Sequence, residues 1–193
     1  MRCKKEEFVK DQYFHFYNHA IGDELLFRED EDYIWFLNKF KIVLQKYPAS
    51  IFAYCLMPNH FHFLIRQDSE KPIYKIFNDL NNPYVKHYNY KYKRVGRLYR
   101  DSLQHIRVYK ENYLIHLCQY IHYNPVKAGI VNRAENWRYS NFLEWIGARN
   151  GDLFDVELLK AYFGDSKDHQ NEIQAFEKYI KEKEFTKLLL EKE

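Results

Sequence analysis

Hydrophobic and polar residues alternate in the first third of the chain with two different periods. Residues 13–19 alternate polar and aromatic side chains, which predicts a strand, and residues 30–47 have the spacing of an amphipathic helix that Pro48 ends. An apolar run at 50–57, the turn signal Pro58-Asn59 and strict alternation at 60–66 predict two strands joined by a tight turn. The apolar residues of the helix that are expected to reach the core are Ile34, Leu37, Phe40, Ile42 and Leu44.

The second half of the chain is expected to be mainly helical. Residues 71–92 have helical spacing, with a kink or restart at Pro83, and a basic loop or hairpin follows at 93–108. Residues 111–124 predict a helix that Pro125 ends, and 137–147 predict a shorter one. The charged stretch 152–193 is helical in pattern, with Phe176, Tyr179, Ile180 and Phe185 spaced as a docking face.

This order of elements predicts an α+β fold with helices covering one face of a mainly antiparallel sheet. A ferredoxin-like arrangement is the simplest such plan. We expect one catalytic domain over residues 1–147 and a helical C-terminal extension over residues 148–193, packed on the domain or appended to it.

Length and cysteine usage favour a cytoplasmic protein without disulfides. A chain of 193 residues can bury a core unaided, and Cys3, Cys55 and Cys118 have no paired spacing that would suggest a disulfide framework or a thiolate zinc site. The start of the chain lacks the apolar stretch of a secretory signal, and no later run reaches about 18 apolar residues. We therefore expect no membrane association.

The net charge of +3 conceals a strong segregation of charge. Between residues 81 and 133, ten Lys and Arg stand against two acids, which gives +8, and Tyr84, Tyr88, Tyr90, Tyr92 and Tyr99 are interleaved with them. A basic and aromatic stretch of this kind is typical of nucleic-acid binders. Aromatic residues make up 19% of the chain, which either supplies surfaces for base stacking or reflects a compositional habit of the genome.

Two histidines are candidates for metal ligands. In the predicted strand at 60–66, alternation places His60 and His62 on one face, so that both imidazoles can reach one divalent cation. Taken alone, two histidines on a polar sheet face are the commoner interpretation.

The predicted helix at 111–124 offers a candidate nucleophile. Its apolar stripe is Leu114, Leu117, Cys118 and Ile121. Tyr120 and Asn124 share a flank rotated away from that stripe, where they can reach one site together. A tyrosine at the rim of the core and an asparagine that stops a helix before proline are the structural alternatives.

These signals combine into one chemistry. Cutting DNA without water needs a nucleophile, a cation to offset phosphate charge and a basic surface to hold the strand. A tyrosine hydroxyl that attacks a phosphodiester conserves the bond energy in a phosphotyrosine linkage, as transposition requires.

Several segments resemble one known family. They are residues 57–65 (MPNHFHFLI), 113–114 with 120–129 (YIHYNPVKAG), 13–18, 94–99 and 137–140. The set is similar to the HUH-type tyrosine transposases of single-strand insertion sequences, and most similar to the REP-associated tyrosine transposases. The resemblance extends over roughly residues 13–147.

The resemblance implies a role for each matching residue. His60 and His62 would hold Mg²⁺ or Mn²⁺, Asn124 would complete the coordination, and Tyr120 would attack DNA near a hairpin and stay on the 5′ phosphate. The implied fold is ferredoxin-like, and the implied partner is single-stranded or hairpin DNA, bound by a monomer or a homodimer. Candidate DNA contacts are Lys93, Arg94, Arg97, Arg100 and Lys127.

Two departures and two alternatives stay open. The chain continues Arg100-Asp101-Ser102-Leu103 where relatives commonly carry an aromatic-Gln-Gly-Arg stretch, and the tail after Gly151 has no motif. A domesticated, non-mobile DNA-hairpin-binding protein would keep the scaffold without mobility. A metal hydrolase would use His60 and His62 to activate water, but it lacks an obvious carboxylate and leaves Tyr120 idle.

Overall fold

A four-stranded antiparallel sheet forms the centre of the molecule in the computed structural model, which describes residues 8–109, 111–151 and 153. The strands are β1 (Tyr13–His19), β2 (Ala49–Met57), β3 (His60–Gln67) and β4 (Gln104–Val108). Their order across the sheet is β2-β3-β1-β4, so β1 and β3 are central. The first three strands lie within one or two residues of the sequence prediction.

Helices connect and follow the strands. They are α1 (Asp30–Leu44), α2 (Tyr74–Lys91), α3 (Glu111–Lys127), the one-turn α4 (Phe142–Trp145) and the 3₁₀ turn η1 (Ala134–Asn136). The order β1-α1-β2-β3-α2-β4 is the ferredoxin-like plan, so the predicted fold class is confirmed. No helix in the described part of the chain combines the length and apolar content needed to cross a bilayer.

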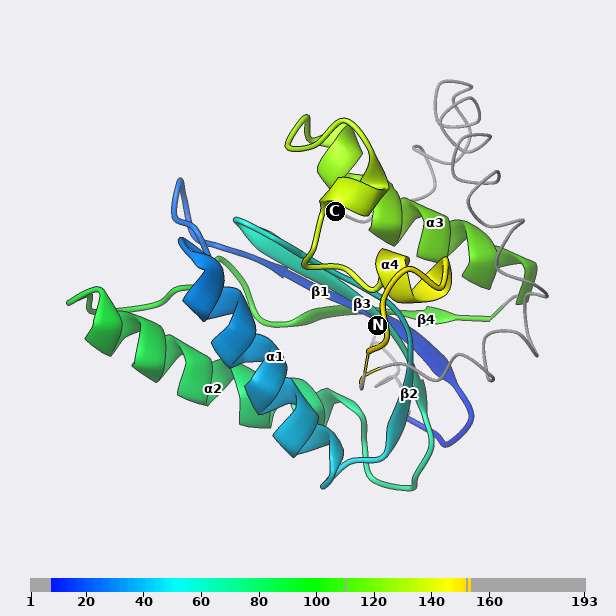
Figure 1. The fold of residues 1–193 in the computed structure, drawn as a ribbon. Helices are drawn as coiled ribbons and strands as arrows, with labels where there is room; N and C mark the ends of the chain where they lie inside the picture. The colour runs from blue at the N-terminus through cyan, green and yellow to red at the C-terminus, as the bar shows by residue number, and fades with distance from the viewer. Residues whose placement is uncertain (1–7, 110, 152, 154–193) are drawn as a thin grey trace, which may run out of the picture.

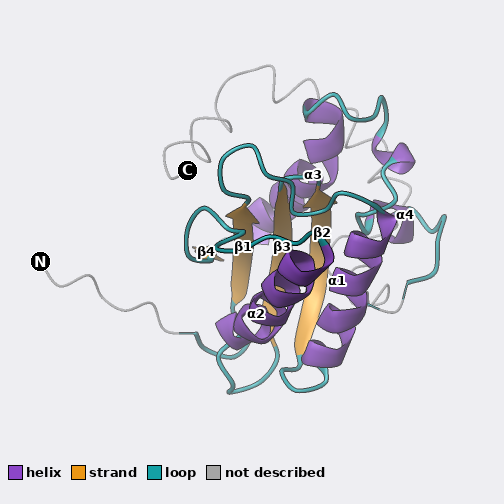
Figure 2. Ribbon diagram, turned by 90° about the vertical axis from the view of Figure 1, so that its left-hand side faces the viewer, coloured by secondary structure: helices purple, strands orange, loops and turns teal. Residues whose placement is uncertain are grey.

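Helices cover both faces of the sheet, whereas the sequence predicted helices on one. Figures 1 and 2 show α1 and α2 together on one face and α3 on the opposite face. The predicted extension at 148–193 lies outside the described residues apart from 148–151 and 153. The second helical layer matters because α3 is the helix that carries Tyr120.

The face under α1 and α2 is packed with aromatic rings. Phe14 and Phe16 of β1 and Phe61 and Phe63 of β3 are fully buried there with rings from both helices. We call this the aromatic face of the sheet. It accounts for much of the aromatic content of the chain, which therefore reflects core packing more than a stacking surface for bases.

The buried stripe of α1 differs from the prediction. Tyr33, Phe36, Phe40 and Val43 are buried, whereas Ile34 is 47% and Ile42 is 55% exposed. The spacing of this helix allows two apolar stripes, and the aromatic one is buried because it removes more surface from water. Sequence periodicity alone cannot choose between them.

Pro125 does not end α3. The helix continues to Lys127 and stops in a Schellman motif, in which Ile130 N donates to Pro125 O (3.0 Å) and Gly129 N to Val126 O (2.9 Å). Gly129 takes a positive φ of 69°, which favours glycine. The extra turn keeps Lys127 on the helix, in line with Tyr120 and Asn124. Likewise, α2 runs through Pro83 without a restart.

The outer edge of β2 is closed by residues 137–141. Leu56 N donates to Tyr139 O (2.9 Å), and the buried side chain of Asn141 accepts from Tyr54 N (2.7 Å) and donates to Phe52 O (3.1 Å). The same amide oxygen lies 2.9 Å from His122 Nε2 of α3. Asn141 therefore joins β2 to α3 and helps to fix the helix on the sheet.

We expect Asn141→Ala to lower the free energy of unfolding by about 3 kcal/mol, because it leaves buried polar groups without partners. Urea unfolding at constant m-value measures the change. The matched control is Asn132→Ala, at an exposed loop position, which should stay within about 0.5 kcal/mol of the parent. An equal effect of the two substitutions would contradict the role given to Asn141.

Candidate active site

Strand register gathers histidines on the face of the sheet opposite the aromatic one. His60 and His62 of β3 pair across β1 with His19 and Tyr17, and His15 lies one further step along. We call the side chains of His15, Tyr17, His19, His60 and His62 the histidine face. The expectation that both candidate ligands point the same way is met, because their rings lie 5.0 Å apart on this face.

Helix α3 brings the candidate nucleophile to this face. The Tyr120 ring meets the His62 ring edge-on at 5.9 Å, and Tyr120 is 8% exposed. Lys127 Nζ lies 5.3 Å from the centre of the Tyr120 ring. Residues 120, 124 and 127 share one helix face by their spacing, so Asn124 lies between the other two. The structure thus brings Tyr120, His62 and Lys127 together, and Asn124 lies on the same helix face as Tyr120.

Asn124 is held in place by its own helix. Its Nδ2 donates to the carbonyl oxygen of Tyr120 at 2.9 Å, and the residue is buried. With the amide nitrogen engaged, the amide oxygen is the atom left to act as a ligand. An oxygen donor of this kind suits Mg²⁺ and Mn²⁺.

Burial keeps the histidines neutral. Desolvation, with smaller contributions from His19 and Lys127, lowers the pKa of His60 to about 3. Desolvation also lowers the pKa of His62 well below its usual value, and it lowers the pKa of His15 to about 3. A neutral imidazole does not have to lose the extra proton of an imidazolium before it binds a cation at neutral pH.

The Nδ1 atoms of both candidate ligands, His60 and His62, lie within hydrogen-bond distance of a neighbouring side chain. His60 Nδ1 lies 2.8 Å from Asn59 Oδ1, and the ring stacks on His19 at 4.7 Å. His62 Nδ1 lies 3.0 Å from His15 Nε2. In both rings Nε2 is therefore the nitrogen left for a metal ion.

The donor set fits a hard divalent cation only with oxygen ligands added. Among the described residues, no three His, Cys, Asp or Glu side chains are grouped to hold a metal ion. Two imidazoles and the Asn124 amide leave positions for water or phosphate oxygens, the ligands that Mg²⁺ and Mn²⁺ favour. This composition suits a site that shares its metal with a phosphodiester.

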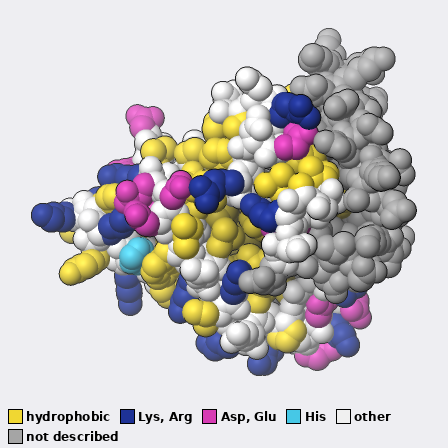
Figure 3. All heavy atoms as spheres, viewed as in Figure 1, with side chains coloured by type: hydrophobic (Ala, Val, Ile, Leu, Met, Phe, Trp, Pro, Cys, Tyr) yellow, Lys and Arg dark blue, Asp and Glu magenta, His cyan; other side chains and the backbone are white. Residues whose placement is uncertain are grey.

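The predicted DNA contacts divide into two groups. Lys93, Arg97, Arg100 and Lys127 are exposed, whereas the Arg94 side chain is only 17% exposed and pairs with Glu24 at 3.0 Å. Arg94 therefore stabilises the loop more than it offers a free contact. On the face shown in Figure 3, Lys and Arg are scattered among Asp and Glu and form no single basic field.

The basic loop lies beside the histidine face. Arg100 N donates to His19 O (3.0 Å), Ile21 N donates to Leu98 O (2.9 Å), and Tyr99 bridges to Ala20. These contacts place the 97–100 segment at the end of β1 where His19 meets His60. A DNA strand bound by this loop would thus approach the histidines.

Sequence reasoning missed His15, Tyr17 and His19. The signal was present, since alternation along β1 puts all three on one face, and antiparallel pairing with β3 brings that face to His60 and His62. What the sequence did not supply was the pairing of β1 with β3.

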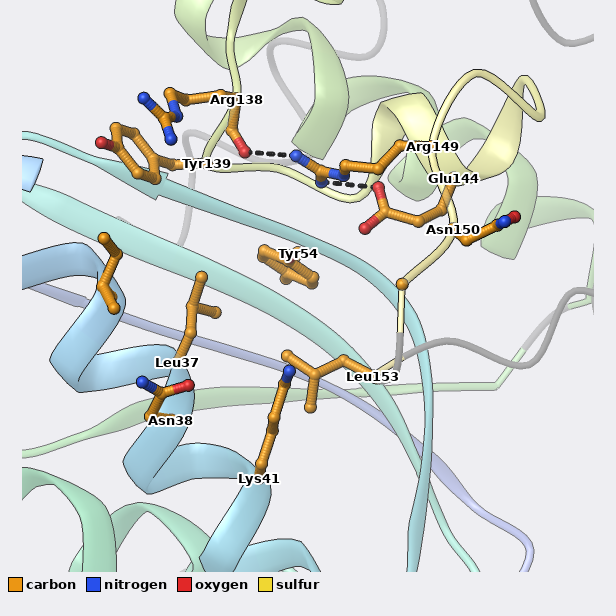
Figure 4. A pocket seen from close by; sticks show the side chains of 12 residues that line it. Leu37, Asn38, Lys41, Tyr54, Arg138, Tyr139, Glu144, Arg149, Asn150 and Leu153 are labelled. Atoms are coloured by element: carbon orange, nitrogen blue, oxygen red, sulfur yellow. Dashed lines mark hydrogen bonds and ion pairs between the residues drawn. The ribbon is translucent and has the colours of Figure 1, made fainter.

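A hollow of roughly 300 Å³ lies away from this site, between α1 and the 138–153 segment. Figure 4 shows Tyr54 at its floor and the Arg149–Glu144 ion pair at its rim. Tyr54 belongs to the aromatic side of β2, so the hollow is separated from Tyr120 by the sheet. It takes no part in the chemistry considered below.

Comparisons with known proteins agree on one group. The sequence profile of the family described as "Transposase IS200 like" matches residues 9–124. A REP-associated tyrosine transposase of Haemophilus influenzae is 30% identical over 123 residues, which cover 58% of this chain and 69% of that protein. The solved structure of a REP-associated tyrosine transposase bound to a REP hairpin matches with a TM-score of 0.65 at 16% identity, covering 80% of this chain and 94% of that chain. This last match is a likeness of fold.

We expect stability to fall as the pH drops below about 6.5. The unfolded chain takes up protons near 6.5, whereas the folded state keeps His15 and His60 neutral to about pH 3 and His122 to about pH 4. Each such histidine therefore removes up to about 1.4 kcal/mol per pH unit. Urea unfolding in EDTA at pH 7.5, 6 and 5 measures the slope.

The matched variant is His122→Gln, which removes a buried histidine that is not a candidate ligand. It should reduce the slope of stability against pH by up to about 1.4 kcal/mol per pH unit, the contribution of one proton. A stability that stays flat between pH 7.5 and 5 would contradict the buried neutral state of these rings.

Proposed function

The chain belongs to the IS200-like transposase family, and on that premise we propose that it is a metal-dependent single-strand DNA endonuclease and transposase. Tyr120 is the proposed nucleophile, and His60, His62 and Asn124 are the proposed metal ligands. The observation that carries the proposal is the position of Tyr120, whose ring centre lies 5.9 Å from that of His62 and 5.3 Å from Lys127 Nζ.

The proposed reaction is a transesterification. The Tyr120 oxygen forms a bond to phosphorus and loses its proton, and the bond from phosphorus to the 3′ oxygen of the neighbouring nucleotide breaks. The released 3′ oxygen takes up a proton, and the 5′ phosphate stays joined to Tyr120. Attack by a 3′ hydroxyl on this phosphotyrosine reverses the step and transfers or rejoins the strand.

The residues of the site have separate tasks in this step. A divalent cation, when bound, supplies charge that polarises the phosphate. His60 and His62 present neutral Nε2 atoms, and Asn124 presents an oxygen. Lys127 adds a positive charge next to the phenol, where it favours a bound phosphate group. Burial of Tyr120 to 8% exposure holds the ring in a single orientation and limits access of water as a competing nucleophile.

We propose hairpin or single-stranded DNA as the substrate. The fold is shared with a transposase that was solved bound to a REP hairpin. In this chain, the exposed Lys93, Arg97 and Arg100 lie in a loop that reaches the histidine face through His19. Contacts between this loop and the phosphates would guide the DNA strand toward Tyr120. The protein would bind the DNA as a monomer or as a homodimer.

A covalent protein–DNA adduct is the expected product. With hairpin DNA from the flanks of its own gene and Mn²⁺ or Mg²⁺, the parent protein should form a protease-sensitive adduct on a denaturing gel. Tyr120→Phe removes the nucleophile and His60→Ala a metal ligand, so both should form none.

Tyr123→Phe, on the same helix, is the matched control and should keep the adduct. Cleavage that survives Tyr120→Phe would favour the metal hydrolase. Binding to the hairpin without any adduct would leave a domesticated hairpin-binding protein.

Arg97→Ala should weaken hairpin binding and reduce the slope of log Kd against log salt by about 0.7 to 0.9, the share of one phosphate contact. The control is Lys75→Ala, also exposed but at the opposite end of α2 from the loop. Fluorescence anisotropy between 50 and 300 mM NaCl measures both. Equal slopes for Arg97→Ala and the parent would remove Arg97 from the DNA contacts.

A further inference from the structure

The two candidate metal ligands are not held in the same way. His60 Nδ1 lies 2.8 Å from Asn59 Oδ1, and an amide oxygen can only accept, so the proton of His60 sits on Nδ1. Its Nε2 is thereby a free donor to metal. His62 Nδ1 instead lies 3.0 Å from His15 Nε2, and an imidazole nitrogen can either donate or accept. The tautomer of His62 is thus set by His15.

His15 is buried deeply enough for its own hydrogen bonds to matter. It is 2% exposed, and its second nitrogen, Nδ1, is buried and has no hydrogen-bond partner among the residues that the structure describes. The ring packs against those of Tyr17 and His62, each 5.1 Å away. A proton placed on His15 Nδ1 therefore has no acceptor, and buried N–H groups without acceptors are rare because they are costly.

Only two arrangements of protons satisfy the His15–His62 contact with neutral rings. In the first, His15 Nε2 donates to His62 Nδ1, and the His62 proton then occupies Nε2 and blocks metal binding. In the second, His62 Nδ1 donates to His15 Nε2, which frees His62 Nε2 for a metal ion but puts a proton on the orphaned His15 Nδ1. The unpartnered Nδ1 disfavours the second arrangement.

We propose that His15 is a positioning residue that controls the tautomer of His62. One tautomer carries the proton on Nε2 and cannot bind metal there, and the other carries it on Nδ1 and can. Without metal, the pair rests in the first arrangement, and binding of a divalent cation drives the second. The inference rests on the proposed function, because it takes His62 as a ligand. His60 stays competent throughout, since Asn59 fixes it.

The switch is balanced in protons. One proton leaves His62 Nε2 for solvent, one moves from His15 Nε2 to His62 Nδ1, and one is taken up from solvent at His15 Nδ1. The net charge of the pair is unchanged, so the switch differs from a titration. Histidines that bind metal through one nitrogen usually donate the other N–H to a fixed acceptor, and loss of that acceptor costs about 10- to 100-fold in metal affinity.

Long-range ¹H–¹⁵N correlation spectra of the full-length protein, without DNA, test the switch directly. In the metal-free protein we expect the His62 proton on Nε2 and the His15 proton also on Nε2. Saturation with Mg²⁺ should move both protons to Nδ1, while His60 keeps its proton on Nδ1 in both states. A His62 proton already on Nδ1 without metal would overturn the proposal.

Two substitutions test the same idea by Mn²⁺ affinity, measured by electron paramagnetic resonance. His15→Phe keeps a ring but has no acceptor, and it should weaken binding by about 10- to 100-fold. His15→Gln places an amide oxygen near the former Nε2 and should bind at least as tightly as the parent. His87→Gln, at a half-buried histidine of α2 on the opposite side of the sheet, should leave the affinity unchanged.

The outcomes separate this inference from the proposed function. If His15→Phe binds Mn²⁺ as the parent does while His62→Ala does not bind, His62 is a ligand and only the role of His15 is refuted. If His62→Ala binds Mn²⁺ normally, the metal site of the proposed function is refuted, and the switch with it.

Discussion

The pairing of β1 with β3 is the constraint on which the rest of the structure depends. Both strands alternate large aromatic side chains with histidines, and antiparallel register places all the histidines on one face. A slip of one residue would move Phe61 and Phe63 out of the core and His60 and His62 into it. The packing that stabilises the aromatic face therefore also determines which side chains share the histidine face.

The position of Lys127 in the site depends on where α3 ends. Because Gly129 and not Pro125 terminates the helix, the last turn carries Lys127 onto the face that holds Tyr120 and Asn124. Asn141 holds the same helix to β2 through His122. The nucleophile thus sits on a rigid element braced at the edge of the sheet, and such rigidity holds reacting groups in productive geometry.

Local pattern was enough to predict some parts of this protein. Alternation predicted β1 and the common face of His60 and His62. Helical spacing placed Tyr120 on a flank rotated away from the apolar stripe of α3, but the structure buries Tyr120 in the same apolar cluster as Leu117 and Ile121. The hydrophobic pattern was not enough where two different stripes of one helix both fit the helical period. Ile34 and Phe36 both fit a helical stripe, and only packing against the sheet selects the second. His15 stayed hidden because its role arises from a partner strand 47 residues away.

Burial in this site works for metal binding and against it at once. Desolvation keeps the imidazoles neutral, so a cation does not meet a charged imidazolium at neutral pH. The same burial leaves His15 Nδ1 without an acceptor among the described residues, which makes the position of each remaining proton matter. His60 escapes this constraint because it lies at the strand end, where Asn59 in the turn supplies an acceptor. At the end of the sheet, His60 can therefore bind a metal ion at once, whereas His62 must first change its tautomer, although both histidines come from the same strand.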